Sequence, residues 1–295
     1  MTQALPSGRP GPAGQAGRQP DAEPAGRRAL PYSALTACRD ALRAEWMKLR
    51  TTSSSAWLVA AIIVLTIAVS AAAAAVNRCP DGMSCPVDTT KLSLTGIQFG
   101  QAVVAILAVL PVCNEYSNGM IRVTLAAMPR RPAVLAAKTI IVGGLVLAAG
   151  AAAALGSLLA ARLILPGHGF TAARGFPPLS LADSPTLRAV AGSVLYLALI
   201  ALLSSGIAAL VRDPAVTIGV VLGSLYLFPV VAAFIGNPTW HRRIERYSPM
   251  AGLNIQATTG LKGLAIGPWA GLGVLAIWAA VALLAGGLAM ARRDA

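Results

Sequence analysis

Long apolar runs, separated by short polar and basic segments, dominate the chain. The six clearest runs are residues 56–76, 97–113, 139–165, 189–211, 215–235 and 268–290. A helix needs about 20 apolar residues to cross a hydrocarbon core, and these runs come close to that length or exceed it. Membrane barrel strands would instead alternate over about 10 residues. The pattern therefore predicts an all-α polytopic membrane protein with about six transmembrane helices, which occupy residues 51–295.

Residues 33–50, directly before the first run, carry apolar side chains at helical spacing. Leu42, Trp46 and Leu49 follow one another at intervals of four and three residues, and most of the charged side chains lie off that stripe. An amphipathic helix with a tryptophan on its apolar face suits the membrane interface. We therefore predict an interfacial helix here. A plain cytoplasmic extension of the first span is the alternative.

Residues 1–32 are rich in Pro, Gly, Ala and Arg and contain few large apolar side chains. Such a segment cannot bury enough apolar surface to offset the entropy lost on ordering. We predict a disordered cytoplasmic tail.

The net charge of +13 is carried mainly at the ends of the apolar runs and in the connecting loops. Lys and Arg in these places favour the cytoplasmic side, and no nucleic-acid motif accompanies them. Basic residues before the first run and between the second and third runs predict that both termini are cytoplasmic. The loop after the fifth run disagrees, because it holds Arg242, Arg243, Arg246 and Lys262. The partners expected from charge are membrane lipids, and no nucleic acid is expected.

That same loop, residues 236–267, is too long for a turn and too apolar for a simple tether. We predict a re-entrant outer segment between spans five and six, with short helices that dip into the outer leaflet.

Cysteines and glycines give two further predictions. Cys79 and Cys85 share the short loop after the first run, and a disulfide between them or two free thiols both fit the sequence. Glycine pairs at four-residue spacing, Gly96 with Gly100 and Gly219 with Gly223, allow close helix approach. The pair Gly219 and Gly223 fits a dimer interface or ordinary packing within the chain.

The runs hold no Asp, Glu, Lys or His, and Arg162 is their one charged residue. Ion-coupled carriers usually place ionisable groups in the membrane, so the sequence disfavours a secondary transporter. No catalytic group, metal site or GxxxxGK[ST] phosphate loop is evident. The neutral polar residues in the runs can join helices or line a path for an amphipathic substrate; they are Gln98, Gln101, Ser157, Ser193, Tyr196, Ser204, Ser205, Thr217, Ser224 and Tyr226.

The loop between the second and third runs carries the most specific motif. Its pattern Glu-Tyr-x-x-Gly-x-x-Arg consists of Glu115, Tyr116, Gly119 and Arg122. The other residues singled out in this loop are Met120, Leu125, Pro129 and Arg130. Together with the helix before the first span, this loop resembles the permease subunit of bacterial type-2 ABC exporters, from about residue 34 to the end. On residues alone, an ordinary basic loop is the alternative.

The resemblance implies a short coupling helix in this loop that docks on a separate ATPase subunit. Glu115 is expected at the amino end of that helix, and Arg122 is expected to pair with acidic ATPase groups. The family's architecture implies a homodimer or paired permease in the bacterial cell membrane. This chain would bind no cofactor, and ATP and Mg²⁺ would sit on the partner. The expected function is outward transport by a chain that is not itself an enzyme. A non-transporting membrane scaffold, sensor or assembly factor is the alternative.

Overall fold

The computed structural model describes residues 34–80, 85–119 and 131–293. The α-helices within this part are α1 (Ala34–Thr51), α2 (Ser53–Val76), α3 (Thr89–Ser93), α4 (Ile97–Ser117), α6 (Arg131–Ile164), α7 (Ser184–Val211), α8 (Pro214–Phe234), α9 (Pro238–Tyr247) and α10 (Pro268–Arg293). Short 3₁₀ helices are η1 (Leu165–His168), η2 (Ala172–Arg174), η3 (Pro249–Gln256) and η4 (Leu261–Gly263). The described residues contain no strand, and the all-α prediction is confirmed.

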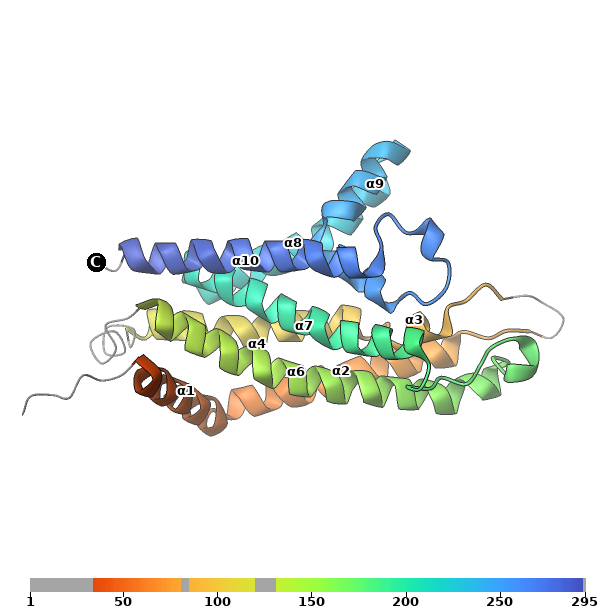
Figure 1. Ribbon diagram of the computed structural model, residues 1–295, viewed down its shortest axis with the longest axis horizontal. Coiled ribbons are helices and arrows are strands. Elements are labelled where there is room, and N and C mark those ends of the chain that lie inside the picture. Colours follow the sequence, from red (N-terminus) through yellow and green to blue (C-terminus); the bar gives the residue numbers. More distant parts are fainter. Residues whose placement is uncertain (1–33, 81–84, 120–130, 294–295) are drawn as a thin grey trace, which may run out of the picture. The chain divides into compact units, whose positions relative to one another are not determined.

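Six helices in the described part are long and apolar enough to span a membrane: α2, α4, α6, α7, α8 and α10. Each coincides with one of the apolar runs in the sequence, so the prediction of a multi-pass membrane protein is confirmed. The helix α1 precedes them, as expected, and begins one residue later than predicted. The bundle has two ends, which we call the α1 end and the disulfide end after the features that mark them (Figure 1).

The helices α4 and α7 lie at the centre of the bundle and are its most buried spans. Close backbone contact holds α4 against α2, because a Cβ added at Gly96 would lie 2.0 Å from the carbonyl oxygen of Thr66. The same is true of α7 and α10, where a Cβ at Gly206 would lie 2.5 Å from the carbonyl carbon of Ala282. Glycine at these positions therefore sets how closely the spans approach.

The other predicted glycine pair is different. A Cβ added at Gly219 or Gly223 would meet no atom within 4 Å. These residues lie on an open side of α8, where Val216, Val220 and Leu227 are also exposed. The alternative of close packing within the chain is therefore wrong for this pair, and a contact with another chain stays a prediction.

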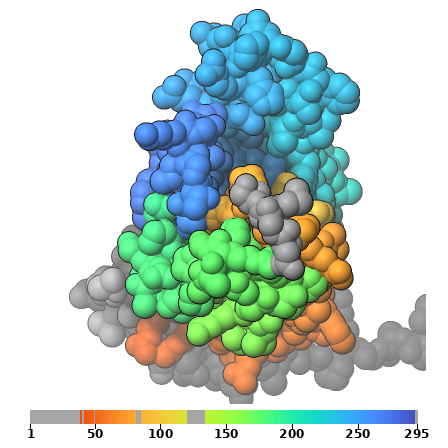
Figure 2. All heavy atoms as spheres, turned by 90° about the vertical axis from the view of Figure 1, so that its right-hand side faces the viewer, coloured from red at the N-terminus to blue at the C-terminus, as the bar shows by residue number. Residues whose placement is uncertain are grey.

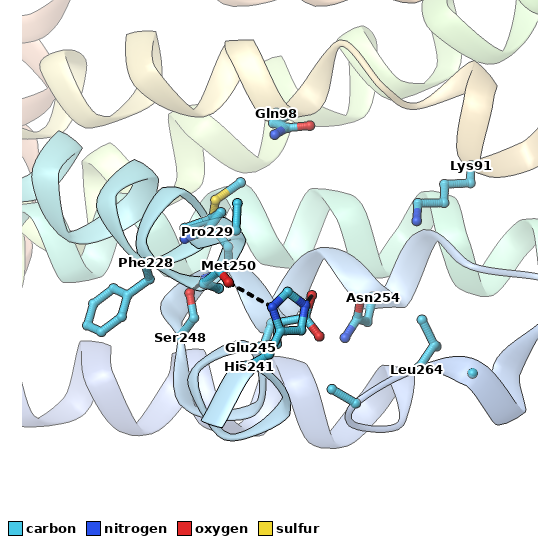
Figure 3. A pocket seen from close by; sticks show the side chains of 15 residues that line it. Lys91, Gln98, Phe228, Pro229, His241, Glu245, Ser248, Met250, Asn254 and Leu264 are labelled. Carbon is cyan, nitrogen blue, oxygen red and sulfur yellow. Dashed lines mark hydrogen bonds and ion pairs between the residues drawn. The ribbon is translucent and has the colours of Figure 1, made fainter. Parts of the chain in front are cut away.

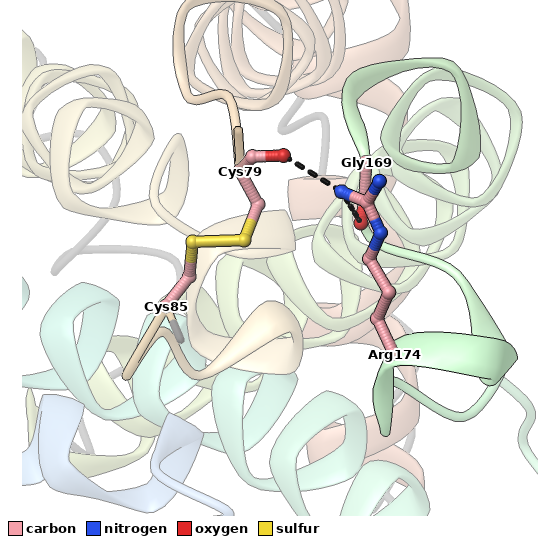
Figure 4. Close-up of a disulfide and its surroundings, with 4 residues drawn as sticks. All are labelled: Cys79, Cys85, Gly169 and Arg174. Carbon is pink, nitrogen blue, oxygen red and sulfur yellow. Dashed lines mark hydrogen bonds between the residues drawn. A yellow bond between two sulfur atoms is a disulfide. The ribbon is translucent and has the colours of Figure 1, made fainter. Parts of the chain in front are cut away.

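The disulfide end is fastened by covalent and polar contacts between its loops. Cys79 and Cys85 form a disulfide with a Cα–Cα distance of 6.0 Å. Arg174 donates to the carbonyl of Cys79 at 2.9 Å (Figure 4). Gly169 has φ +92°, and a Cβ there would lie 2.3 Å from that same carbonyl oxygen. These contacts hold the loop after α2 closely against the turn after α6.

The segment between α8 and α10 folds back into the bundle. Its helix η3 packs against α7 and α10, and Ile255 is fully buried over Gly192. Asp88 at the start of α3 holds the residues that follow η3, since it accepts hydrogen bonds from the backbone of Thr258 and Thr259. Figure 2 views the disulfide end and shows α9 and the loops around it on that face.

Candidate functional site

The Glu-Tyr-x-x-Gly motif forms the end of α4. Glu115 and Tyr116 lie in the last turn of this helix, and Asn118 follows as its C-cap. Gly119 then adopts φ +67°, with its N–H donating to the carbonyl of Tyr116 at 3.2 Å. A glycine in this left-handed conformation is the usual way to end a helix. The prediction that Glu115 begins a helix is therefore wrong, because glycine placed four residues later stops the preceding span instead.

The remaining residues of the predicted coupling loop fall outside the described residues. They are Met120, Arg122, Leu125, Pro129 and Arg130. What the structure does show is how the two ends of this segment are held. The segment leaves α4 two residues after Glu115, and α6 begins at Arg131, seven residues before Lys138.

Four charged side chains from three helices form a closed ring at this point, which we call the charge ring: Glu45 and Lys48 of α1, Glu115 of α4 and Lys138 of α6. The Lys138 ammonium lies 2.8 Å from Glu45 Oε2 and 2.7 Å from Glu115 Oε1. The Lys48 ammonium lies 2.9 Å from Glu45 Oε1 and 2.8 Å from Glu115 Oε1. Acid and base thus alternate around the ring, and the four formal charges cancel.

The ring is largely removed from solvent. Exposed fractions of the side chains are 5% for Glu45, 5% for Lys138 and 9% for Glu115, whereas Lys48 is 41% exposed. Buried ions stabilise a fold only when each is paired and hydrogen-bonded. Lys138 meets this condition, because it also donates to the carbonyl of Pro111 at 3.3 Å. Removing any one member would leave its partners buried with an unbalanced charge.

Lys48 is the member of the ring that faces solvent. Partial burial opposes its charge, but hydrogen bonds and attraction from Glu115 and Glu45 outweigh that effect and raise the pKa of Lys48 above its ordinary value. A raised lysine pKa means that the folded state favours the ammonium form. The contribution of Lys48 to holding α1 is therefore present at neutral pH and is lost as the pH rises through the folded-state pKa of this lysine.

On the apolar stripe that the sequence predicts for α1, Leu42 is half-buried and Trp46 is 49% exposed. Among the α1 side chains that the structure describes, Glu45 is the buried one. It lies three residues after Leu42 and therefore on the same face. Leu49 belongs to the same helix. The exposed Trp46 stays available for the membrane interface that the sequence predicts.

Tyr116 ties the same end of α4 to α7. Arg212 lies over its ring, with the guanidinium carbon 4.7 Å from the ring centroid. Arg212 itself has φ 67° and caps α7. Around this contact, Val112 and Cys113 of α4 pack with Met290 of α10 in a small apolar cluster. The motif residues Glu115 and Tyr116 therefore contact four helices between them: α1, α6, α7 and, through the cluster, α10.

A cavity of about 370 Å³ lies beside the charge ring. Its polar walls include Thr51, Thr52 and Asn114, and its apolar walls include Leu58 and Leu107. The cavity separates the start of α2 from the end of α4 over part of their length. It leaves room for these two helix ends to move relative to each other while the ring holds α1, α4 and α6 together.

Neutral polar residues of the spans act mainly as contacts between or within helices. Tyr196 donates to Gln101 Oε1 between α7 and α4. Tyr226 donates to the carbonyl of Gln98 at 2.6 Å, which joins α8 to α4. Ser204 bonds within its own helix, to the carbonyl of Ile200. Among these residues the structure favours helix joining over a polar path.

Sequence reasoning missed Glu45 and treated Lys138 as one basic residue among several in a loop. Lys138 directly precedes the third apolar run, whereas Glu45 lies eleven residues before the first, and the available signal was their position. Glu45 shares a helix face with Leu42, and Lys138 stands seven residues after the first residue of α6.

Among the described residues, no group of three or more His, Cys, Asp or Glu side chains is placed to hold a metal ion. A comparison with protein-family models and with curated proteins finds no match to this chain.

Proposed function

We propose that the chain is the membrane-spanning permease subunit of an ABC exporter, driven by a separate ATPase that docks on the segment between α4 and α6. The charge ring is the observation that carries this proposal. It binds Glu115 and Lys138 to each other at 2.7 Å, on either side of that segment. A force applied to the segment would therefore act on α4 and α6 together.

The ring also includes α1 through Glu45. A docked ATPase would consequently move α1 and the ends of two spans as one body. Tyr116 and Arg212 extend the contact to α7, the central span. This is the arrangement that a transport cycle requires, because closure of the ATPases must change how the spans pack.

Two features support a cytoplasmic α1 end. Arg39, Arg43 and Arg50 of α1 are exposed, and basic residues favour the cytoplasmic side. The opposite end holds the disulfide, which suits an oxidising exterior. The chain would then have both termini in the cytoplasm of a bacterial cell.

Co-purification and activity together test the proposal. The tagged chain, extracted from its native membrane, should retain a P-loop ATPase whose ATP hydrolysis depends on the chain. Glu115→Gln should keep the chain inserted but reduce ATPase association or stimulated hydrolysis. Asp213→Asn is the matched control, since Asp213 is exposed, caps α8 and lies outside the ring. Failure to retain any ATPase would favour a scaffold or sensor, and equal behaviour of the two variants would remove the ring from coupling.

A further inference from the structure

A second cavity, of about 340 Å³, lies at the disulfide end. Its walls come from α3, the start of α4, the end of α8, α9 and η3 (Figure 3). These walls combine a lysine ammonium, a carboxylate and an apolar side. A ligand of this cavity would have to match the cation, the carboxylate and the apolar wall together.

The cavity lies at the level where spans meet the membrane surface. Gln98 is in the first turn of α4, and Ala232 and Ala233 are in the last turn of α8. The helix α9 starts directly beyond and exposes Trp240 and Tyr247, as helices in the headgroup zone do. A ligand in this cavity would therefore share the depth of lipid headgroups.

One wall presents the carboxylate of Glu245 beside the ring of His241. His241 Nδ1 lies 2.8 Å from the carbonyl oxygen of Ala232. A carbonyl can only accept, so Nδ1 carries the hydrogen in this contact. His241 Nε2 lies 3.3 Å from Glu245 Oε1, the separation of an ion pair when the ring is protonated. The Glu245 side chain is 48% exposed, so its carboxylate can still accept from an N–H donor of a ligand.

The facing wall carries the opposite charge. Lys91 comes from α3 and lines the cavity together with Gln98 (Figure 3). Within the part of the chain that the structure describes, its ammonium makes no hydrogen bond or ion pair. An anionic group of the ligand would bind there, across the cavity from Glu245.

The third wall is apolar. Phe228, Pro229, Ala232 and Ala233 of α8 line it. Next to them Val230 and Phe234 are 51% and 86% exposed, so the apolar surface continues out of the cavity along the span. Acyl chains could follow this surface while the headgroup stays in the cavity.

We propose that this cavity binds a phospholipid with a phosphoethanolamine headgroup. Its primary ammonium donates to Glu245, its phosphate pairs with Lys91, and its acyl chains lie along α8. A choline headgroup lacks the N–H donors that the Glu245 carboxylate would accept. A glycerol headgroup lacks the positive charge. The inference depends only on this cavity and on membrane insertion, and it holds whether or not the chain is a permease.

The test is native mass spectrometry of the full-length chain released from detergent, with dioleoyl phosphatidylethanolamine, phosphatidylcholine or phosphatidylglycerol added. We expect the ethanolamine lipid to bind about tenfold more tightly than the other two, as loss of one charge-assisted hydrogen bond implies. Glu245→Gln should abolish this preference, and Lys91→Gln should weaken all three lipids. Asp213→Asn and Lys262→Gln make the same charge changes outside the cavity and should have no effect.

Equal binding of the three lipids to the unmodified chain would overturn the proposal. So would an unchanged ethanolamine preference in Glu245→Gln, whose exposed position lets the variant fold. Water-soluble glycerophosphoethanolamine carries the same headgroup without acyl chains. If it displaces the lipid at equal concentration, the occupant is a free headgroup compound and the lipid assignment is wrong; weak competition supports the lipid.

Discussion

Replacing Lys138 with methionine should destabilise the fold more than any surface lysine replacement. The side chain has similar length but no charge, and Glu45 and Glu115 would remain buried with Lys48 as their one shared cation. Lys138 now makes two charged contacts, at 2.7 and 2.8 Å, and a third hydrogen bond at 3.3 Å. Breaking a buried ion pair by removing one partner costs about 3–5 kcal/mol.

A double-mutant cycle separates the ring from simple loss of packing. Glu115→Gln with Lys138→Met removes one acid and one base, which leaves Glu45 paired with Lys48 and no net buried charge. We expect this double variant to be more stable than Lys138→Met alone, with a coupling energy between the two positions of about 0.5–3 kcal/mol. If the two substitutions acted independently, their losses of stability would add.

The assay is equilibrium unfolding of the purified chain in mixed micelles, with the melting temperature as a second measure. A loss of about 3–5 kcal/mol lowers the melting temperature on the order of 10 °C. Lys262→Met is the matched control, because Lys262 is exposed between η3 and α10. The reasoning fails if Lys138→Met is no worse than Lys262→Met, or if adding Glu115→Gln lowers stability further.

Three further predictions concern the rest of the bundle. Burial raises the pKa of Asp88, but the N–H groups of Lys91, Thr259 and Thr258 outweigh that effect and lower it below its ordinary value. Its contribution to stability is therefore present above about pH 3.9 and lost as the pH falls through the folded-state pKa, and acid unfolding of Asp88→Asn should be less pH-dependent. Gly96→Leu should unfold the chain at room temperature, whereas Gly219→Leu should leave its melting temperature within about 2 °C, since only the first position faces another helix. Membrane-impermeant thiol reagent should label Cys79 and Cys85 in whole cells after mild reduction and not before; labelling without reduction would contradict the disulfide, and no labelling after reduction would contradict the proposed orientation.

The spans could be predicted from sequence because burial in lipid leaves a local signal. Each apolar run became a helix, and two of these helices extend well past their runs at the α1 end: α4 continues four residues beyond residue 113, and α6 starts eight residues before residue 139. Those extensions hold the charges that matter most. Glu115 follows the second run and Lys138 precedes the third, so both were assigned to a loop, where charge is ordinary. Their pairing depends on how α4 and α6 pack, and no local pattern encodes that.

The glycine pairs illustrate the same limit. Gly96 with Gly100 and Gly219 with Gly223 have the same spacing and similar apolar surroundings. Only the first pair touches another helix of the chain, because α4 is central and α8 is peripheral. The disulfide was equally undecided from sequence, since two cysteines six residues apart in a polar loop fit a bond or two thiols. Spacing sets what is geometrically allowed, and tertiary packing selects among the allowed outcomes.

The two candidate sites are connected by a single helix. Gln98 at the start of α4 lines the cavity at the disulfide end, and Glu115 at the end of α4 belongs to the charge ring. A helix of 21 residues is about 30 Å long. Pro111 lies one turn before Glu115, and its missing N–H weakens the helix where the ring holds it. Motion imposed at the ring can therefore bend α4 near Pro111 or shift the whole helix along Gly96 and α2. Only a shift of the whole helix would reach the cavity at the disulfide end. The close contact at Gly96 therefore decides whether the two ends of the bundle move together.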